Sequence, residues 1–259
     1  MEYLQRIEKN PYSDILWNVP EQKQGVLAVI GGNSQNFRTP VKIAEYLSAK
    51  YPVHEVRVIL PDVLRGKVPE LANFIFAKST ESGSVADGAE IDTILDAADY
   101  GLVIGDLSKN SITGSALVSA YESSDKPILI TRDAVDLLAE NCTETTLMRD
   151  GLMVVASMAQ VIKLFRAVYY PKMVTLSQSM VQVAEALHKF TMSYPLGIVT
   201  LQSGQLLVAK DGAVNVVPLD ITSLTPLSLW MGETAARIAA LNMYNPGKFI
   251  EAAVTALLD

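Results

Sequence analysis

A glycine-rich turn after a buried strand is the part of this chain best suited to hold a small molecule. Residues 26–30 are apolar without alternation, which predicts a strand covered on both faces, and Gly31-Gly32-Asn33 follows at once. Glycine lets the backbone turn tightly and approach a ligand closely. Thr39-Pro40 then has the cap and first-turn proline of a helix start. This order is typical of the carboxyl edge of a parallel sheet, where α/β proteins place small-molecule sites.

The polar side chains of this turn could line a pocket. Asn33 and Asn36 carry both donors and acceptors, and Ser34 lies between them. A tight connection from strand to helix, with its polar side chains in water, explains the same residues equally well. Both interpretations stay open at this point.

Two carboxylates end other predicted strands. Gly105-Asp106 follows the strand 100–104, and Asp133 follows the strand 127–130. Carboxyl ends of neighbouring parallel strands share one edge, so the two acids are expected to converge and could hold Mg²⁺ together with water and phosphate. Helix capping is the alternative for each. Arg132 could bind an anionic ligand, although an ion pair with Asp133 is the simpler reading.

Further candidates lie near the end of the chain. Gly232-Glu233 opens a helix, where Glu233 could act as a base or simply serve as a first-turn acid. In the predicted hairpin, Ser203-Gly204 forms the first turn, and Lys210 could meet a phosphate or stay solvated at the surface.

Composition narrows the class of protein. The chain has 259 residues, 49% of them hydrophobic, with a net charge of −7 and a pI near 5.0. Without a Lys/Arg cluster, a nucleic-acid surface is not expected. The apolar runs fall short of the roughly 18 residues that a membrane span needs. One cysteine, Cys142, excludes an internal disulfide, and with two histidines it makes a zinc site improbable. We expect a cytoplasmic protein that contacts neither nucleic acid nor membrane.

Strand and helix patterns alternate along most of the chain, which predicts an α/β fold with a largely parallel central sheet and helices on both faces. We expect one domain over residues 1–259, in which residues 1–25 form an amino-terminal helix and a polar lead-in. The stretch 62–90 is irregular and its role is obscure. Asp211-Gly212 predicts a hairpin turn between two late strands.

From about Lys23 to Leu258, this order of segments resembles the ribokinase-like superfamily and, within it, the ADP- or ATP-dependent NAD(P)H-hydrate dehydratases. The resemblance is carried by the following motifs: Lys23-Gln24-Gly25 before the first strand, Gly31-Gly32-Asn33, Ile104-Gly105, Asp133-Ala134, the hairpin from Leu201 to Val217, and Gly232-Glu233 before an alanine-rich helix. It implies a ribokinase-like fold related to the carbohydrate kinases. It also implies a substrate near Gly31, Gly32, Asn33, Asn36, Gly105, Asp106 and Asp133, and a nucleotide near Ser203, Gly204, Lys210 and Gly232.

The family phosphorylates the added hydroxyl of a hydrated nicotinamide cofactor, after which phosphate leaves. It does so with a Gly-Ser-Gly-Asp turn that forms an anion cradle and supplies the base. The corresponding stretch here is Trp230-Met231-Gly232-Glu233. It keeps one glycine, adds bulk, and lengthens the acid, and a shift of about 1 Å can lower a rate about 100-fold.

Other family motifs are also altered. Thr131-Arg132-Asp133 replaces Asp-Ala-Asp, residues 105–109 keep only the first glycine of Gly-Pro-Gly-Leu-Gly, and Gln202-Ser203 replaces Lys-Gly. The segment 155–160 replaces Thr-Pro-His-x-Gly-Glu and loses every polar feature of that motif.

Three functions follow from the resemblance. The chain could be an active hydrate dehydratase (a lyase) or small-molecule kinase with Glu233 as base, using ATP or ADP with Mg²⁺. It could instead bind a nucleotide or dinucleotide-like ligand with catalysis weak or lost, or serve as a non-catalytic assembly subunit. We expect a homo-oligomer, with Tyr169-Tyr170-Pro171 at its interface.

Overall fold

The computed structural model describes residues 2–12, 19–68, 71, 73–172 and 174–258 and contains one ten-stranded sheet with the order β1-β10-β9-β8-β7-β6-β5-β2-β3-β4. All strands run parallel except β9, which pairs antiparallel with both β8 and β10. The strands are β1 (Leu4–Arg6), β2 (Gln24–Gly31), β3 (Val53–Pro61), β4 (Phe74–Ala77), β5 (Tyr100–Gly105), β6 (Ile128–Thr131), β7 (Leu152–Val155), β8 (Gly197–Gln202), β9 (Gln205–Lys210) and β10 (Ala213–Pro218).

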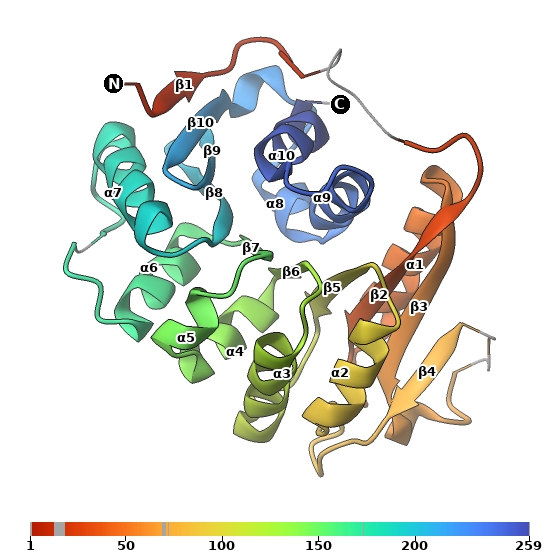
Figure 1. Cartoon of the computed structure of the whole chain (residues 1–259). Coiled ribbons are helices and arrows are strands. Elements are labelled where there is room, and N and C mark those ends of the chain that lie inside the picture. The colour runs from red at the N-terminus through yellow and green to blue at the C-terminus, as the bar shows by residue number, and fades with distance from the viewer. Residues whose placement is uncertain (1, 13–18, 69–70, 72, 173, 259) are drawn as a thin grey trace.

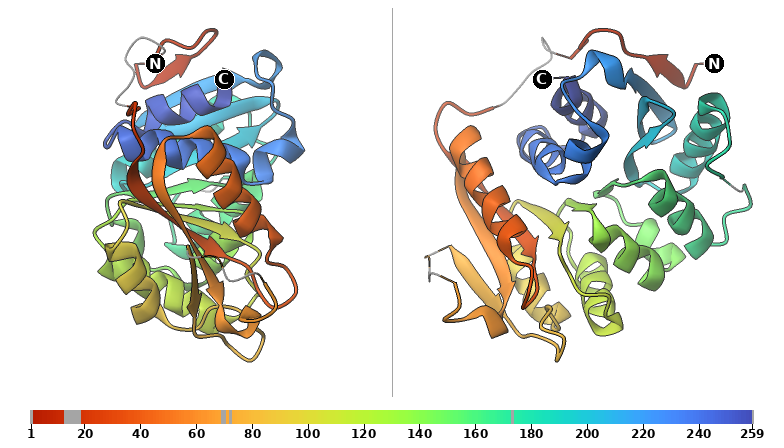
Figure 2. Two further views of the ribbon diagram at one scale, coloured as in Figure 1. Left: turned by 90° about the vertical axis from the view of Figure 1, so that its right-hand side faces the viewer. Right: turned by 180° about the vertical axis from the view of Figure 1, so that it is seen from behind.

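Helices cover both faces of the sheet, which curves around α9 and α10 (Figure 1). The helices are α1 (Arg38–Lys50), α2 (Gly88–Asp96), α3 (Ser111–Ser123), α4 (Asp133–Asn141), α5 (Glu144–Leu147), α6 (Met158–Ala167), α7 (Met180–Ser193), α8 (Pro226–Trp230), α9 (Glu233–Tyr244) and α10 (Phe249–Leu258). Helices α1, α9 and α10 pack on one face, and α2, α3, α4, α6 and α7 lie on the other (Figure 2). In the parts of the chain described, no helix has both the length and the apolar character needed to cross a membrane.

The central strands are buried on both sides because successive side chains enter different cores. In β2, Leu27 and Val29 belong to the core beneath α1, α9 and α10, whereas Ala28 and Ile30 belong to the opposite core. All four are fully buried. The continuous apolar run therefore reflects a strand with two covered faces, as the sequence predicted, and the expected α/β architecture is confirmed.

The amino-terminal segment differs from expectation. Leu4–Arg6 forms strand β1, which pairs with Val214–Val216 of β10, in place of part of the helix expected over residues 1–25. Residues 13–18 of that prediction lie outside the described residues. The open edge of β10 supplies backbone partners that a local reading of the sequence does not reveal.

The obscure stretch 62–90 extends the sheet and folds over its edge. Strand β4 (Phe74–Ala77) pairs with the end of β3. The loop that follows reaches the segment after β5, where Ser84 Oγ accepts a 2.9 Å hydrogen bond from Ser108 N–H and contacts the Ser108 hydroxyl at 2.6 Å. This segment therefore supports the loop that carries Asp106.

Two fully buried tyrosines, Tyr100 and Tyr121, differ in whether their hydroxyl groups are hydrogen-bonded. Tyr100 of β5 donates a 3.2 Å hydrogen bond to Asn242 Oδ1 of α9, whereas the buried Tyr121 hydroxyl has no hydrogen-bond partner among the described residues. We expect Tyr100→Phe to lower the free energy of unfolding by about 1–3 kcal/mol because it leaves Asn242 Oδ1 unsatisfied. Tyr121→Phe, the matched control, should change it by less than about 0.5 kcal/mol or raise it. Urea denaturation of both variants measures the difference, and equal losses would contradict this assignment.

Candidate functional site

The carboxyl ends of β5 and β6 are joined by a side-chain hydrogen bond. Asp106 N–H donates to Asp133 Oδ1 at 2.7 Å. The approach requires Gly105, which has φ +83°, because a Cβ on this residue would lie 2.2 Å from the same oxygen. The two acids that the sequence predicted to converge are therefore adjacent, with one carboxylate held by the backbone of the other residue.

An ion pair stands beside this contact. Arg132 Nη2 contacts Asp106 Oδ1, and the two side chains are 26% and 17% exposed. Both residues have left-handed backbones, with φ +59° at Arg132 and +56° at Asp106. Such conformations are uncommon outside glycine and persist where the surroundings fix them. Here Gln160 Nε2 donates to the Arg132 carbonyl at 2.7 Å, which helps to hold that peptide in place.

The turn after β2 is tied to the same loop. Asn33 Nδ2 donates to the Asp106 carbonyl at 2.7 Å, and Asn33 Oδ1 accepts the N–H groups of Gln35 at 2.8 Å and Asn36 at 3.0 Å. Gly32 N–H donates to the Gly105 carbonyl at 2.9 Å. Asn33 thus fixes the connection, while Asn36 remains exposed.

Asp106 lies at the boundary of two cavities. The smaller, of about 350 Å³, is lined by Gln35, Asn36, Phe37, Arg38, Thr39 and Asp106. The larger, of about 640 Å³, is lined by Asp106, Arg132, Asp133, Asp136, Ser157, Ala159, Gln160, Lys163, Leu227, Trp230 and Met231. The two cavities share Asp106 and lie at the carboxyl ends of β2, β5 and β6. Together they are called the hollow below.

Charges of both signs line the larger cavity. Lys163 forms an ion pair with Asp136, which also accepts a 2.8 Å hydrogen bond from Gln160 Nε2. Burial raises the pKa of Asp133 above its ordinary value, while the hydrogen bond from Asp106 N–H opposes this rise. The lining thus has three carboxylates and two cations, and each cation has a carboxylate partner.

Gly232 and Glu233 lie apart from these acids. Gly232 caps α9 with φ +103°, and a Cβ there would lie 2.7 Å from the Ile104 side chain. Glu233 is exposed and is absent from the lining of the cavity. It lies near Tyr46 of α1: burial raises the pKa of Tyr46, Arg237 lowers it, and Glu233 adds to the rise. The candidate base therefore faces α1, while Trp230 and Met231 reach the cavity.

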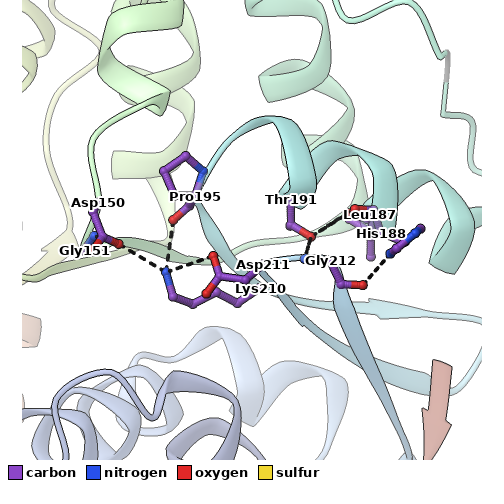
Figure 3. A network of polar contacts seen from close by, with 9 residues as sticks. All are labelled: Asp150, Gly151, Leu187, His188, Thr191, Pro195, Lys210, Asp211 and Gly212. Atoms are coloured by element: carbon purple, nitrogen blue, oxygen red, sulfur yellow. Dashed lines mark hydrogen bonds and ion pairs between the residues drawn. The ribbon is translucent and has the colours of Figure 1, made fainter. Parts of the chain in front are cut away.

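The structure separates the remaining nucleotide-site candidates. Ser203 and Gly204 form the exposed turn between β8 and β9, outside the lining of both cavities. Lys210 lies at the other end of β9, and because β9 runs antiparallel this end is at the opposite edge of the sheet. There Lys210 Nζ contacts the Pro195 carbonyl at 3.2 Å and Asp150 at 3.4 Å (Figure 3). Lys210 and Gly232 therefore do not share a site.

Figure 3 also places His188 at this opposite edge, where its Nδ1 contacts the Gly212 carbonyl. Its ring stacks on Tyr3 at 3.9 Å between centroids. These contacts pack the half-buried His188 ring against its neighbours.

The segment 155–160, which lacks the polar features of the family motif, makes polar contacts of its own. Ser157 caps α6 in a capping box with Gln160, and the Gln160 amide then reaches Arg132 and Asp136 on the neighbouring segment. The serine and glutamine spacing is the sequence signature of such a box. The contacts with α4 could not have been found this way, because they depend on the pairing of β6 with β7.

Among the described residues, no group of three or more His, Cys, Asp or Glu side chains is arranged to hold a metal ion. Asp106 is paired with Arg132, and one oxygen of Asp133 accepts the Asp106 N–H. These two carboxylates do not by themselves fit a magnesium site.

No protein-family model matches this chain, and no curated protein sequence matches it. Solved structures do. A hypothetical protein from Streptococcus mutans has a TM-score of 0.62 at 15% identity, over 92% of this chain and 82% of the other. The ADP/ATP-dependent NAD(P)H-hydrate dehydratase of Bacillus subtilis, co-crystallised with ATP/Mg²⁺, has a TM-score of 0.62 at 11% identity, over 92% and 81%.

The pyridoxal kinase of Bacillus subtilis, solved as an ADP complex, has a TM-score of 0.53 at 12% identity, over 90% of this chain and 89% of the other. The fold of this chain is ribokinase-like. At these identities the likeness establishes the fold alone, so the function must be argued from the site.

The buried Asp133 carboxyl predicts a pH effect on stability. A carboxyl whose folded pKa lies above its ordinary value of 3.8 gives a stabilising contribution that is complete below that value and is lost as the pH rises through the folded value. Asparagine can accept the same hydrogen bond without ionising. We therefore expect the free energy of unfolding of Asp133→Asn, relative to the wild type, to increase between about pH 3 and pH 7. Urea denaturation across this range measures it, and a constant difference would show that burial does not disfavour the charged form.

Proposed function

We propose that this protein binds a nucleotide or dinucleotide-like ligand in the two cavities that adjoin Asp106, and that it transfers phosphate weakly or not at all. It is thus a divergent protein of the NAD(P)H-hydrate dehydratase type. The observation that carries the proposal is the contrast between an open, charged hollow at the ends of β2, β5 and β6 and a turn ahead of α9 in which the Met231 N–H is already bonded to the Ser228 carbonyl.

The binding half of the proposal is supported by the size and position of the hollow. Cavities of about 640 and 350 Å³ lie within the usual range for small-molecule sites, about 300–1,000 Å³. They lie at the carboxyl edge of a parallel sheet, the usual place for ligands in this architecture. Their polar groups, such as Asp106 and Arg132, accompany apolar ones, such as Trp230.

The loss of phosphoryl transfer is supported by the chain immediately before α9. Helix α8 runs to Trp230, and Met231 keeps a right-handed helical backbone whose N–H donates to the Ser228 carbonyl at 3.2 Å. An anion cradle needs successive backbone N–H groups free to point at the phosphate. Here one of them is already used, and the exposed Glu233 lies outside the cavity.

The solved relatives name ATP with Mg²⁺ and ADP, so adenine nucleotides are the first ligands to test for this chain. Any Mg²⁺ would be held mainly by the phosphates of the nucleotide, since the described carboxylates do not form a metal cluster. A cytoplasmic location and a homo-oligomeric state complete the proposal. The 92% exposed Tyr169 is a candidate interface residue, whereas Tyr170 packs against Phe165 and Phe190.

A thermal-shift screen with ATP, ADP, NADH and NADPH tests the binding. A ligand that binds only the folded state raises the apparent stability as RT ln(1 + [L]/Kd), so at least one of the four should raise Tm, while free ribose as the control should not. The same samples, given hydrated NADH with ATP or ADP, should show little or no dehydration. A turnover comparable to that of the Bacillus subtilis enzyme, measured in parallel, would contradict the loss of catalysis, and four unchanged Tm values would contradict the binding.

A second prediction concerns Glu233 alone. Because its side chain is exposed and faces α1, Glu233→Gln should leave both the ligand-induced change in Tm and any residual turnover unchanged within about twofold. Steady-state kinetics and thermal shift on the purified variant measure this. A loss of about 100-fold in turnover at unchanged Tm would instead identify Glu233 as the base.

A further inference from the structure

Arg132 stands out among the groups that line the larger cavity. Its Nη2 contacts the Asp106 carboxylate, but its Nε–H is buried and finds no acceptor within the described part of the chain. A guanidinium carries five N–H donors in a planar fork that suits a carboxylate or a phosphate in two-point contact. The single pairing with Asp106 therefore leaves donor capacity beside the cavity.

The local backbone keeps this side chain at the wall of the cavity. Arg132 has φ +59° and ψ −141°, and its partner Asp106 is also left-handed. Gln160 holds the Arg132 carbonyl, and Asp133 holds the Asp106 N–H.

Lys163 is the other cation of the lining and is less suited to binding. Its side chain is 46% exposed, compared with 26% for Arg132, and it pairs with Asp136. An ammonium gives a point charge without the planar fork of arginine, and its greater exposure screens that charge. An anion in the cavity is therefore expected to bind Arg132 more strongly than Lys163.

We propose that Arg132 binds the anionic group, a phosphate or a carboxylate, of the ligand in this cavity. This group takes the place of the Asp106 carboxylate at the guanidinium. The apolar part of the ligand then lies against Leu227, Trp230 and Met231. Asp106 acts as an internal competitor that holds the guanidinium until the anion arrives. The identity of the complete ligand rests on the function proposed above, whereas the anion contact can be tested with simple ions.

Isothermal titration calorimetry of the full chain with inorganic pyrophosphate and, separately, with malonate tests the contact and tells the two anion sources apart. The wild type should bind at least one of these probes. Arg132→Gln should weaken that binding about tenfold or more, because a charge-assisted contact is lost. Asp106→Asn should tighten it about threefold, because a competing, partly exposed charge is removed. Asparagine also tolerates the left-handed backbone of residue 106.

Matched variants separate this exchange from a general change of charge. Lys163→Gln alters the net charge by the same amount as Arg132→Gln, and Glu185→Gln, at an ion pair on α7 outside the cavity, alters it by the same amount as Asp106→Asn. Each should change the affinity by less than about twofold. The ¹⁵N resonance of the Arg132 side chain, assigned by its absence in Arg132→Lys, should move on addition of the anion that binds. This signal keeps the test valid if Arg132→Gln fails to fold.

Binding of neither anion, or losses in Lys163→Gln equal to those in Arg132→Gln, would overturn the proposal. Anion binding that depends on Arg132, without any effect of nucleotides on Tm, would support the anion contact and defeat the proposed function. Nucleotide binding that is unchanged in Arg132→Gln would support the proposed function and defeat the anion contact.

Discussion

The candidate site depends on one hydrogen bond, from Asp106 N–H to the carboxylate of Asp133. It draws the ends of β5 and β6 so close that only glycine fits at position 105. With Asp106 turned into a left-handed conformation, its carbonyl faces Asn33 and its carboxylate meets Arg132. The end of β2 is thereby fixed to the ends of two other strands, and the two cavities share a wall. The burial that raises the pKa of Asp133 is the cost of this arrangement.

The two ends of the hollow differ in how their backbone groups are used. At Asp106, the backbone N–H donates to Asp133 and the carbonyl accepts from Asn33. The charged side chains of Asp106 and Arg132 line the larger cavity. Ahead of α9, the chain is helical almost without interruption, since α8 ends at Trp230 and α9 begins at Glu233. Met231 N–H donates to the Ser228 carbonyl, so this amide of the turn is not available to a phosphate. This difference underlies our proposal that the first end binds a ligand and that the second transfers phosphate weakly or not at all.

The sequence predicted the sheet well because its central strands are apolar on both faces and are punctuated by glycine and proline. It also predicted that Asp106 and Asp133 converge, because parallel strands end at one edge. It did not place Lys210 correctly: the hairpin was expected, but the reversal of β9 carries this lysine to the far edge. The direction of Glu233 depends on the rotation of α9 against α1, and Gln160 acquires its partners only when β6 and β7 pair. Neither is encoded in local spacing.

Strand β1 has a consequence for the handling of this protein. Its three residues pair with the outer side of β10. The seven strands from β9 to β3 have a neighbour on each side, and β10 would have one on only one side without β1. An unpaired strand presents a row of free amides and carbonyls and is a template for aggregation. Shortening the chain from its amino terminus would therefore reduce solubility before it affected the distant cavities, and a purification tag is better attached through a linker that leaves Leu4–Arg6 free to pair.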